Sequence, residues 1–483
     1  MITRNINSSG RGVTSNVDWV AVLLYFALIA FGWVNIYAAT NSGSADSAFA
    51  ITERYGMQLI WIGGSLWIGV MMMLLDYKYY HIFAYPAYIL AMIVVLLTLT
   101  PLGHEANGAR AWLKLGPILI QPAEFLKIGT ALAVARLMSA YTFSTKKLDD
   151  VAKLAMIIGI PMLVILLQND TGSALVYCSF LFMLFREGLN VWIYVVIGFV
   201  VALFVLSFWI EPTVMLVLLI LVCTLLQTLQ NGNIKESLQY LSLVALTSIA
   251  VFYLFVALGA SVAMFWCIII ALALSLPLMV MYAYRNHLGN VFMYLLLFVF
   301  SVGFSQVTDV VFDKMQPHQQ HRILDLLGIE SDVSNWGYNV IQSKIAIGSG
   351  GFAGKGFMNG TQTKFNFVPE QETDFIFCTV GEEWGFMGTM FVIVLFALFI
   401  LRLMRMGERQ QESFGRVYCY SVAGIFMIHV FINIGMTIGL MPVIGIPLPF
   451  FSYGGSSFLA FSLLFFIALR LDEANRELNS FSV

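Results

Sequence analysis

Long apolar runs alternate with short polar connectors along most of the chain. Each run has about 18 to 25 residues, which is enough for a helix to cross the hydrocarbon core of a bilayer. The alternating ten-residue pattern of barrel strands is not present. We therefore expect an all-α, polytopic helical membrane protein with about fourteen spans. The expected spans lie near 17–39, 57–75, 80–100, 119–140, 152–168, 172–186, 190–209, 213–230, 237–257, 260–283, 289–309, 377–403, 416–438 and 447–469.

Composition supports a membrane protein. The 483 residues are 60% hydrophobic and 11% charged, whereas soluble domains carry about 25% charged residues. A net charge of -2 indicates no nucleic-acid partner. The five cysteines lie in or beside apolar runs without paired spacing, so we interpret them as packing residues and expect neither disulfides nor a zinc site.

The distribution of basic residues predicts the orientation. The first apolar run is too long for a signal-peptide core, so residues 1–483 are treated as one integral membrane domain. With the N-terminus inside, 16 of the 25 basic residues face the cytoplasm, as the positive-inside rule requires. Both termini are then cytoplasmic. Eight of the nine remaining basic residues fall within 110–127 and 314–364, which points to a shared outward-facing site.

The segment 107–129 carries the first group of these residues. Gln121-Pro122 predicts a helix start, because proline is tolerated at the first helical position. Gln121, Glu124 and Lys127 then follow at spacings of three, on one face. Charged residues inside a span are costly unless they face a polar cavity or a partner. A mutual Glu124–Lys127 pair, or snorkelling of Lys127 to the surface, stays an alternative.

Further along, Asp170 follows an apolar run and precedes another. It is either the cap of the next helix or a residue with a direct role.

A long polar segment at about 310–376 forms the largest expected outward-facing loop. Its GSGGFAGKG stretch fails as a phosphate loop, because Ser349 replaces the first glycine and Gly356 replaces the Ser/Thr. We interpret it as a re-entrant loop whose N–H groups form an anion nest. Asp374 ends the segment, and the residues alone leave it either a helix cap or a catalyst.

Two other regions stand out. In residues 433–457, prolines and glycines break the helical pattern at membrane depth, where such backbone must be buried or line a cavity. Residues 210–290 are nearly uncharged, hold four expected spans and show no chemistry of their own, so packing or partner docking is their plain interpretation.

The chain resembles the SEDS family (shape, elongation, division and sporulation), which includes RodA, FtsW and SpoVE. The resemblance covers most of the chain outside about 210–290 and is closer to RodA, of cell elongation, than to FtsW, of division. It rests on NGARAW at Asn107–Trp112, QPAEFLK at Gln121–Lys127, the D-x-G pattern at Asp170, PHQQHR at Pro317–Arg322, QSKIAIGSGG, FVPEQETDFIF, GEEWG at Gly381–Gly385 and PVIGIPLPFFSYGGSS at Pro442–Ser457.

The resemblance implies a peptidoglycan glycosyltransferase that polymerises lipid II outside the cytoplasmic membrane, with a class B penicillin-binding protein and the elongation machinery as partners. It also implies an essential Asp374 paired with Lys127. The expected catalytic residues are Asp374 as general base and Lys127. The expected substrate-binding residues are Arg110, Trp112, Glu124, Gln121, Lys355, Glu370 and Ser452.

Three features depart from the family pattern. Relatives commonly have about ten spans, so the four at 210–290 look like an insertion. Glu372 stands where many relatives have histidine, and Ala123 replaces a usual serine. No compact metal-ligand cluster is evident, and a divalent cation (Mg²⁺ or Mn²⁺) stays an open alternative. A lipid II flippase and a non-catalytic scaffold for a penicillin-binding protein are the rival functions.

Overall fold

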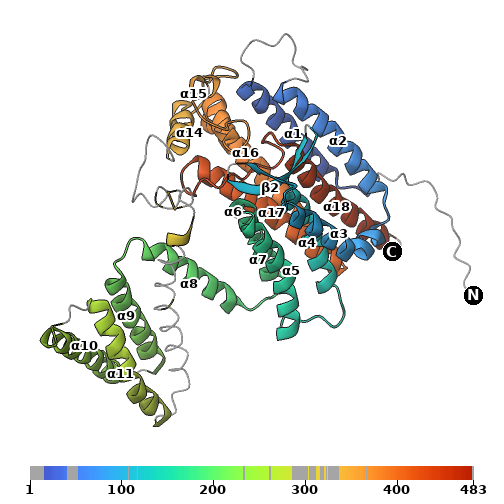
Figure 1. Ribbon diagram of the computed structural model, residues 1–483. Helices are drawn as coiled ribbons and strands as arrows, with labels where there is room; N and C mark the ends of the chain where they lie inside the picture. The colour runs from blue at the N-terminus through green and yellow to red at the C-terminus, as the bar shows by residue number, and fades with distance from the viewer. Residues whose placement is uncertain are drawn as a thin grey trace, which may run out of the picture. The chain divides into compact units, whose positions relative to one another are not determined.

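The computed structural model describes residues 16–40, 53–285 and 337–480, except 107, 117, 232–233, 260–262 and 366, together with isolated residues between 303 and 324. These residues form helices and one small sheet (Figure 1). The helices are α1 (Trp19–Thr40), α2 (Arg54–Leu74), α3 (Tyr77–Leu97), α4 (Pro122–Met138), α5 (Leu148–Leu167), α6 (Thr171–Val176), α7 (Ser179–Arg186), α8 (Val191–Ser207), α9 (Pro212–Asn231), α10 (Ile234–Ala257), α11 (Met264–Arg285), α14 (Tyr338–Ser349), α15 (Thr361–Lys364), α16 (Ile376–Glu408), α17 (Ser413–Thr437) and α18 (Gly455–Ser480).

The helical membrane class is confirmed. Within the described ranges, seven helices are long and apolar enough to cross a membrane: α1, α2, α3, α5, α16, α17 and α18. The span expected near 172–186 is divided into α6 and α7, and the one expected near 289–309 lies outside the described residues. The last span starts at Gly455 instead of 447, because the proline-rich residues before it are not helical.

The chain divides into two compact units, Met1–Asn190 with Arg322–Val483, and Val191–His321. In the second unit, α9, α10 and α11 pack around Leu216, Val244 and Phe265, and α8 packs on α9 through Leu203. The expected insertion at 210–290 falls within this unit, and its being an insertion stays a prediction.

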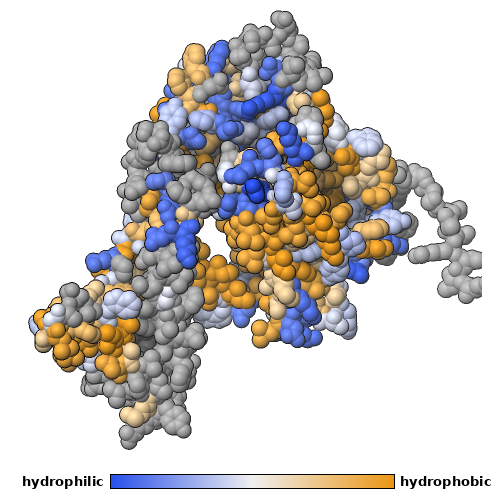
Figure 2. Space-filling view, in the orientation of Figure 1, coloured by the Kyte–Doolittle hydropathy of each residue, from blue (hydrophilic) through white to orange (hydrophobic). Residues whose placement is uncertain are grey.

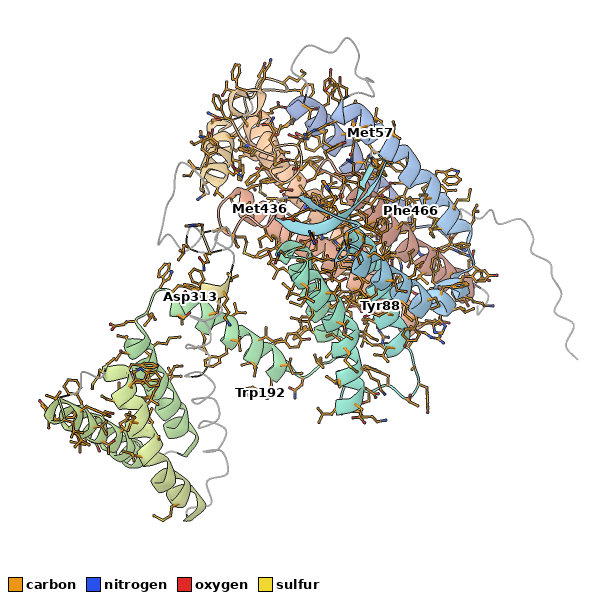
Figure 3. The ribbon with its side chains drawn as sticks, in the orientation of Figure 1. Met57, Tyr88, Trp192, Asp313, Met436 and Phe466 are labelled. Carbon is orange, nitrogen blue, oxygen red and sulfur yellow. The ribbon has the colours of Figure 1, made fainter. Side chains whose placement is uncertain are left out.

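The first unit is held together by interlocking aromatic side chains. The Tyr25 ring stacks on Phe465 with centroids 4.9 Å apart, and Phe399 meets Phe426 edge-on at 5.2 Å. These contacts join α1, α16, α17 and α18 at one core, where aromatic pairs add stability beyond the area they bury. At its margin Phe466 lies over Gly69 of α2, and the Tyr88 hydroxyl donates to the Ile157 carbonyl to join α3 and α5 (Figure 3).

Buried ions tie the helices together at the end where α1 begins and α16 finishes. Asp18, 1% exposed, accepts hydrogen bonds from Arg402, Arg409 and Arg476. Arg409 and Arg476 also pair with Asp472 of α18. The three arginines neutralise and hydrogen-bond the two aspartates, whose burial as unpaired charges would otherwise destabilise the fold.

The opposite end carries a small sheet that the hydropathy pattern does not predict. Strands β1 (Gly103–Ala106), β2 (Ala109–Leu115) and β3 (Ile118–Ile120) pair antiparallel in that order, between α3 and α4. Figure 2 shows hydrophilic residues gathered around β2, above the hydrophobic exposed surface of α5 and α7. We call this end of the first unit the site end.

Candidate active site

Asp374 lies in a tight turn just before α16 at the site end. The Glu370 carbonyl accepts hydrogen bonds from the backbone N–H groups of Thr373, Asp374 and Phe375, with Glu370 itself at a φ of 51°. The N-cap position of α16 is occupied by Phe375. Asp374 therefore does not stand at the capping position, and the turn leaves its side chain partly exposed.

The backbone of Asp374 is fastened to the irregular segment before α18. Asn433 of α17, fully buried, donates through Nδ2 to the carbonyls of both Asp374 and Ile446, each at 2.8 Å. A Cβ on Gly445 would stand 3.3 Å from Asp374 Oδ2, so this glycine borders the carboxylate. Residues 448–452 of the proline-rich segment are buried as expected, whereas residues 438–445 are partly or fully exposed, and Gly445 borders Asp374 at this surface.

Lys127 is fully buried on α4, where three side chains surround its ammonium group. Its Nζ lies 2.8 Å from Glu124 Oε2 and 2.9 Å from His429 Nε2, and 5.3 Å over the Phe461 ring. The pair with Asp374 that the resemblance implied is not formed at ion-pair distance. The structure has the alternative Glu124–Lys127 pair, because the two side chains lie one helical turn apart on the same face.

The predicted start of α4 is confirmed, with Gln121 at the N-cap and Pro122 at the first helical position. Gln121 Nε2 donates to Asp170 Oδ2 at 2.7 Å and to Ser173 Oγ at 3.2 Å. Asp170 also caps α6 by accepting from the Ser173 N–H at 3.0 Å. The capping interpretation of Asp170 is therefore correct, and Gln121 serves to join α4 to α6.

Arg110 and Trp112 lie on β2. The Arg110 N–H donates to the Gln168 carbonyl, which fastens the sheet to the end of α5. The Arg110 side chain is 56% exposed, with Nε 3.7 Å from Glu105 Oε2. Trp112 stands opposite His104 in the sheet and is partly buried. Arg110 is thus a cation accessible to a ligand, whereas Lys127 is enclosed.

The glycine-rich stretch 348–356 is built into a break in α16 at Gly385. There the Phe386 and Met387 N–H groups donate to the carbonyls of Gly351 and Phe352, while Lys355 and Gly356 donate to those of Glu382 and Glu383. A broken helix inside a membrane needs such partners for its freed backbone groups. The re-entrant loop stays a prediction. The anion nest is not formed by Gly354, Lys355 and Gly356, because their N–H groups already donate to the carbonyls of Gly350, Glu382 and Glu383.

Lys355, expected at the substrate, pairs instead with Glu382. Its Nζ lies 2.7 Å from both Glu382 Oε1 and Thr361 Oγ1. The buried Glu382 carboxylate also accepts from the backbone N–H groups of Thr361, Gln362 and Thr363. This arrangement indicates a structural role for Lys355.

The remaining expected residues differ in access. The Glu370 side chain is exposed and accepts from Thr373 Oγ1 at 3.2 Å. Ser452 is buried, and its Oγ accepts from the Leu448 N–H at 2.8 Å. Glu370 can therefore meet a ligand, whereas Ser452 stabilises the turn before α18.

Several residues that the structure brings into the site are given no role by the motifs or their spacing. Arg54 pairs with Glu372, which precedes Asp374 by two positions in the chain, and its guanidinium lies over the Tyr453 ring. His429, Asn433 and Glu382 are polar residues within apolar runs. Polar residues at membrane depth mark functional or structural sites by default, and that rule would have found these three.

The metal expectation is not tested by the structure. Within the described residues, no group of three or more His, Cys, Asp or Glu side chains is placed to hold a metal ion. The divalent cation stays a prediction.

Comparison with known proteins gives evidence on the family that is independent of the site geometry. The family model FtsW/RodA/SpoVE, described as a cell cycle protein, matches residues 18–217 and 208–477. The peptidoglycan glycosyltransferase RodA of Treponema pallidum is 33% identical over 456 residues, covering 92% of this chain and 95% of the relative. The peptidoglycan glycosyltransferase MrdB of Escherichia coli K12 is 29% identical over 483 residues, covering 100% of both chains.

Solved structures agree in fold. A chain from a study of how a peptidoglycan synthase complex coordinates polymerization and crosslinking is 25% identical, with a TM-score of 0.59 over 95% of this chain and 98% of that one. The rod shape determining protein RodA of Thermus thermophilus is 22% identical, with a TM-score of 0.55 over 95% of this chain and 97% of that one.

Proposed function

Because this chain belongs to the FtsW/RodA/SpoVE family, we propose that it is a peptidoglycan glycosyltransferase that polymerises lipid II for cell elongation and rod shape. The relatives bearing the names RodA and MrdB support the activity class and the elongation branch. The observation that supports this function most directly is the position of Asp374. Its side chain is partly exposed, and its backbone is held next to α16 by Asn433 of α17 and by the 445–447 segment.

The proposed reaction joins the 4-hydroxyl oxygen of one lipid-linked disaccharide to the anomeric carbon of another. As that C–O bond forms, the bond from the anomeric carbon to the pyrophosphate breaks, and undecaprenyl pyrophosphate leaves with the electron pair. Asp374 takes the hydroxyl proton, since an alcohol needs a base when it attacks. A positioned carboxylate supplies about 10²- to 10⁴-fold. A single displacement predicts inversion at the anomeric carbon.

Positive charge must meet the leaving pyrophosphate. Arg110 is suited to direct contact, because its guanidinium is half exposed at the site end. Lys127 is enclosed by Glu124, His429 and Phe461. It acts on the pyrophosphate through its field, or directly once the Glu124 pair opens. Trp112, Gln121 and Glu370 complete the proposed sugar-binding surface.

The proposal places the site end outside the cytoplasmic membrane and both termini in the cytoplasm, as the distribution of basic residues predicts. A class B penicillin-binding protein would crosslink the product, which is consistent with the solved synthase complex that the fold resembles. A divalent cation, Mg²⁺ or Mn²⁺, would share the neutralisation of the pyrophosphate.

The two rival functions fit the site less well. A lipid II flippase requires polar groups along a path across the membrane, whereas Asp374, Arg110 and Lys127 belong to the site end. A non-catalytic scaffold gives no reason for a buried ion pair between Glu124 and Lys127, whose burial costs free energy.

The test supplies labelled lipid II to purified protein, alone and with its penicillin-binding partner. We expect glycan polymer from the wild type, and from Asp149→Asn, which changes an exposed carboxylate on α5. Asp374→Asn should lose polymerisation by at least about 10²-fold. Normal polymerisation by Asp374→Asn would remove the base assignment. Translocation of lipid II into vesicles without polymer would favour the flippase.

A further inference from the structure

His429, in the middle of α17, is a buried histidine that the mechanism above does not use. Its ring is 1% exposed, with Nε2 2.9 Å from Lys127 Nζ and Nδ1 3.2 Å from the Pro447 carbonyl oxygen. The ring also stands edge-on to Phe461 at a centroid distance of 4.7 Å. Each polar atom of this histidine therefore has a partner of the site, one on α4 and one in the segment before α18.

The two contacts require the same tautomer. An ammonium can only donate hydrogen bonds, so Nε2 must hold the lone pair that faces Lys127. A carbonyl can only accept, so Nδ1 must carry the proton that faces Pro447. The neutral Nδ1–H imidazole meets both conditions.

The same face of α17 reaches Asp374. Asn433 lies one turn after His429 and donates to the carbonyls of Asp374 and Ile446. His429 contacts the carbonyl of Pro447, the residue after Ile446, and the Nζ of Lys127. Residues 429 and 433 thus connect the lysine of α4, the segment 445–447 and the aspartate before α16 through one rigid helix.

We propose that His429 is a positioning residue for Lys127: its neutral ring, oriented by Pro447, holds the ammonium at a fixed place relative to Asp374. This inference rests on the proposed function and adds a residue to the same site. Its physical basis is that catalytic charges act at full strength only when their supporting groups lock them, and a misplacement of about 1 Å can cost about 10²-fold in rate.

Two amide substitutions separate the two contacts. Asn places its amide where Nδ1 lies, so His429→Asn can keep the bond to Pro447 but cannot reach Lys127. Gln extends to the place of Nε2, so His429→Gln can keep an acceptor for Lys127. With lipid II as substrate, we expect kcat to fall at least about tenfold in His429→Asn with KM changed less than about threefold, and His429→Gln to stay within about threefold of wild type.

Ser421→Ala is the matched control on α17. Its buried hydroxyl donates to the Val417 carbonyl of its own helix and lies outside the site, so kcat should be unchanged. Equal losses in His429→Asn and His429→Gln, with both proteins folded by size-exclusion chromatography, would overturn the proposal. Retained activity in His429→Asn would overturn it as well.

A second measurement does not depend on polymerisation. In a double-mutant cycle of Lys127→Met and His429→Asn, followed by SDS-induced unfolding, the two changes should be non-additive by more than about threefold in the unfolding equilibrium constant. Additive effects would show that the contact is absent. A wild type that makes no polymer while the cycle shows coupling would refute the proposed function and leave the contact in place.

Discussion

Replacement of Glu382 by alanine removes the carboxylate around which residues 354–363 are arranged. Oε1 accepts from Lys355 Nζ and the Thr361 N–H at 2.7 Å, and from the Gln362 N–H at 2.9 Å. Oε2 accepts from the N–H and Oγ1 of Thr363, both at 2.9 Å. The carboxylate itself is fully buried in α16, so these donors replace the water that burial removed.

The magnitude follows from which donors can regain water. Thr363 is buried, so its two donors lose their partner outright, at about 1–3 kcal/mol each. Thr361 and Gln362 are more exposed and recover by hydration. We expect Glu382→Ala to favour local opening of the segment by about 2–6 kcal/mol. Lys355→Ala should cost less than Glu382→Ala, because the N–H groups of Thr361, Gln362 and Thr363 still satisfy the buried carboxylate and the Lys355 side chain is 27% exposed.

Limited proteolysis measures this opening. Trypsin cleaves after Lys364, which is present in every variant, and its rate follows the population of the open form. An opening equilibrium shifted by about 2–6 kcal/mol predicts cleavage faster by about thirtyfold or more in Glu382→Ala. Glu382→Gln replaces one accepting oxygen with an NH₂ group that faces the bound N–H groups. Its cleavage rate should therefore fall between the rates of Glu382→Ala and Lys355→Ala. Equal rates in Glu382→Ala and Lys355→Ala would refute the reasoning, because the ion pair and not the backbone donors would then hold the segment.

Three further predictions concern the scaffold. Gly385→Ala should destabilise the protein by more than about 3 kcal/mol on SDS titration. The φ angle of Gly385 is 65°, and the new Cβ would stand 2.3 Å from the Gly354 nitrogen. Gly159→Ala, with open space around it, is the control and should cost nothing measurable. Burial raises the pKa of Asp18, but hydrogen bonds from Arg409 and Arg402 lower it by more, so the folded pKa lies below the usual value. The stability that Asp18 contributes is then complete above its unfolded pKa of about 3.9 and is lost as pH falls through the folded pKa. Asp18→Asn should flatten this loss of stability in unfolding titrations between pH 5 and pH 3. An unchanged slope would contradict the role of Asp18 in this pH dependence. A variant lacking residues 210–290 should still polymerise lipid II in the same assay, and loss of polymer from the folded variant would show that this region takes part in catalysis.

Several features follow from short stretches of sequence. The start of α4 at Pro122 and the cap that Asp170 gives α6 depend on neighbours within a few residues. The pair of Glu124 with Lys127 is also local, since the two residues are three positions apart on one helix. Such interactions are predictable because the helix itself brings their members together.

Other features depend on partners far along the chain. His429 lies 302 positions from Lys127 in sequence, and nothing in either stretch indicates the contact. The break in α16 is stable because the segment 350–356 supplies donors and acceptors to it. The sheet at 103–120 was missed because its strands are short and their pairing, not their hydrophobic pattern, defines them.

By itself, the sequence determined the membrane class, the place of the seven helices that are long and apolar enough to cross a membrane within the described residues, and the family motifs that include Asp374 and Lys127. This is possible because a bilayer forces each span to satisfy its own backbone hydrogen bonds, so a local apolar run is enough to specify a helix. Tertiary structure alone decided which charges meet: Lys127 with Glu124 and His429, Lys355 with Glu382, and the Asp374 backbone with Asn433. These pairings depend on how helices from distant parts of the chain pack against one another, and buried polar groups accept whichever partner that packing brings within hydrogen-bond distance.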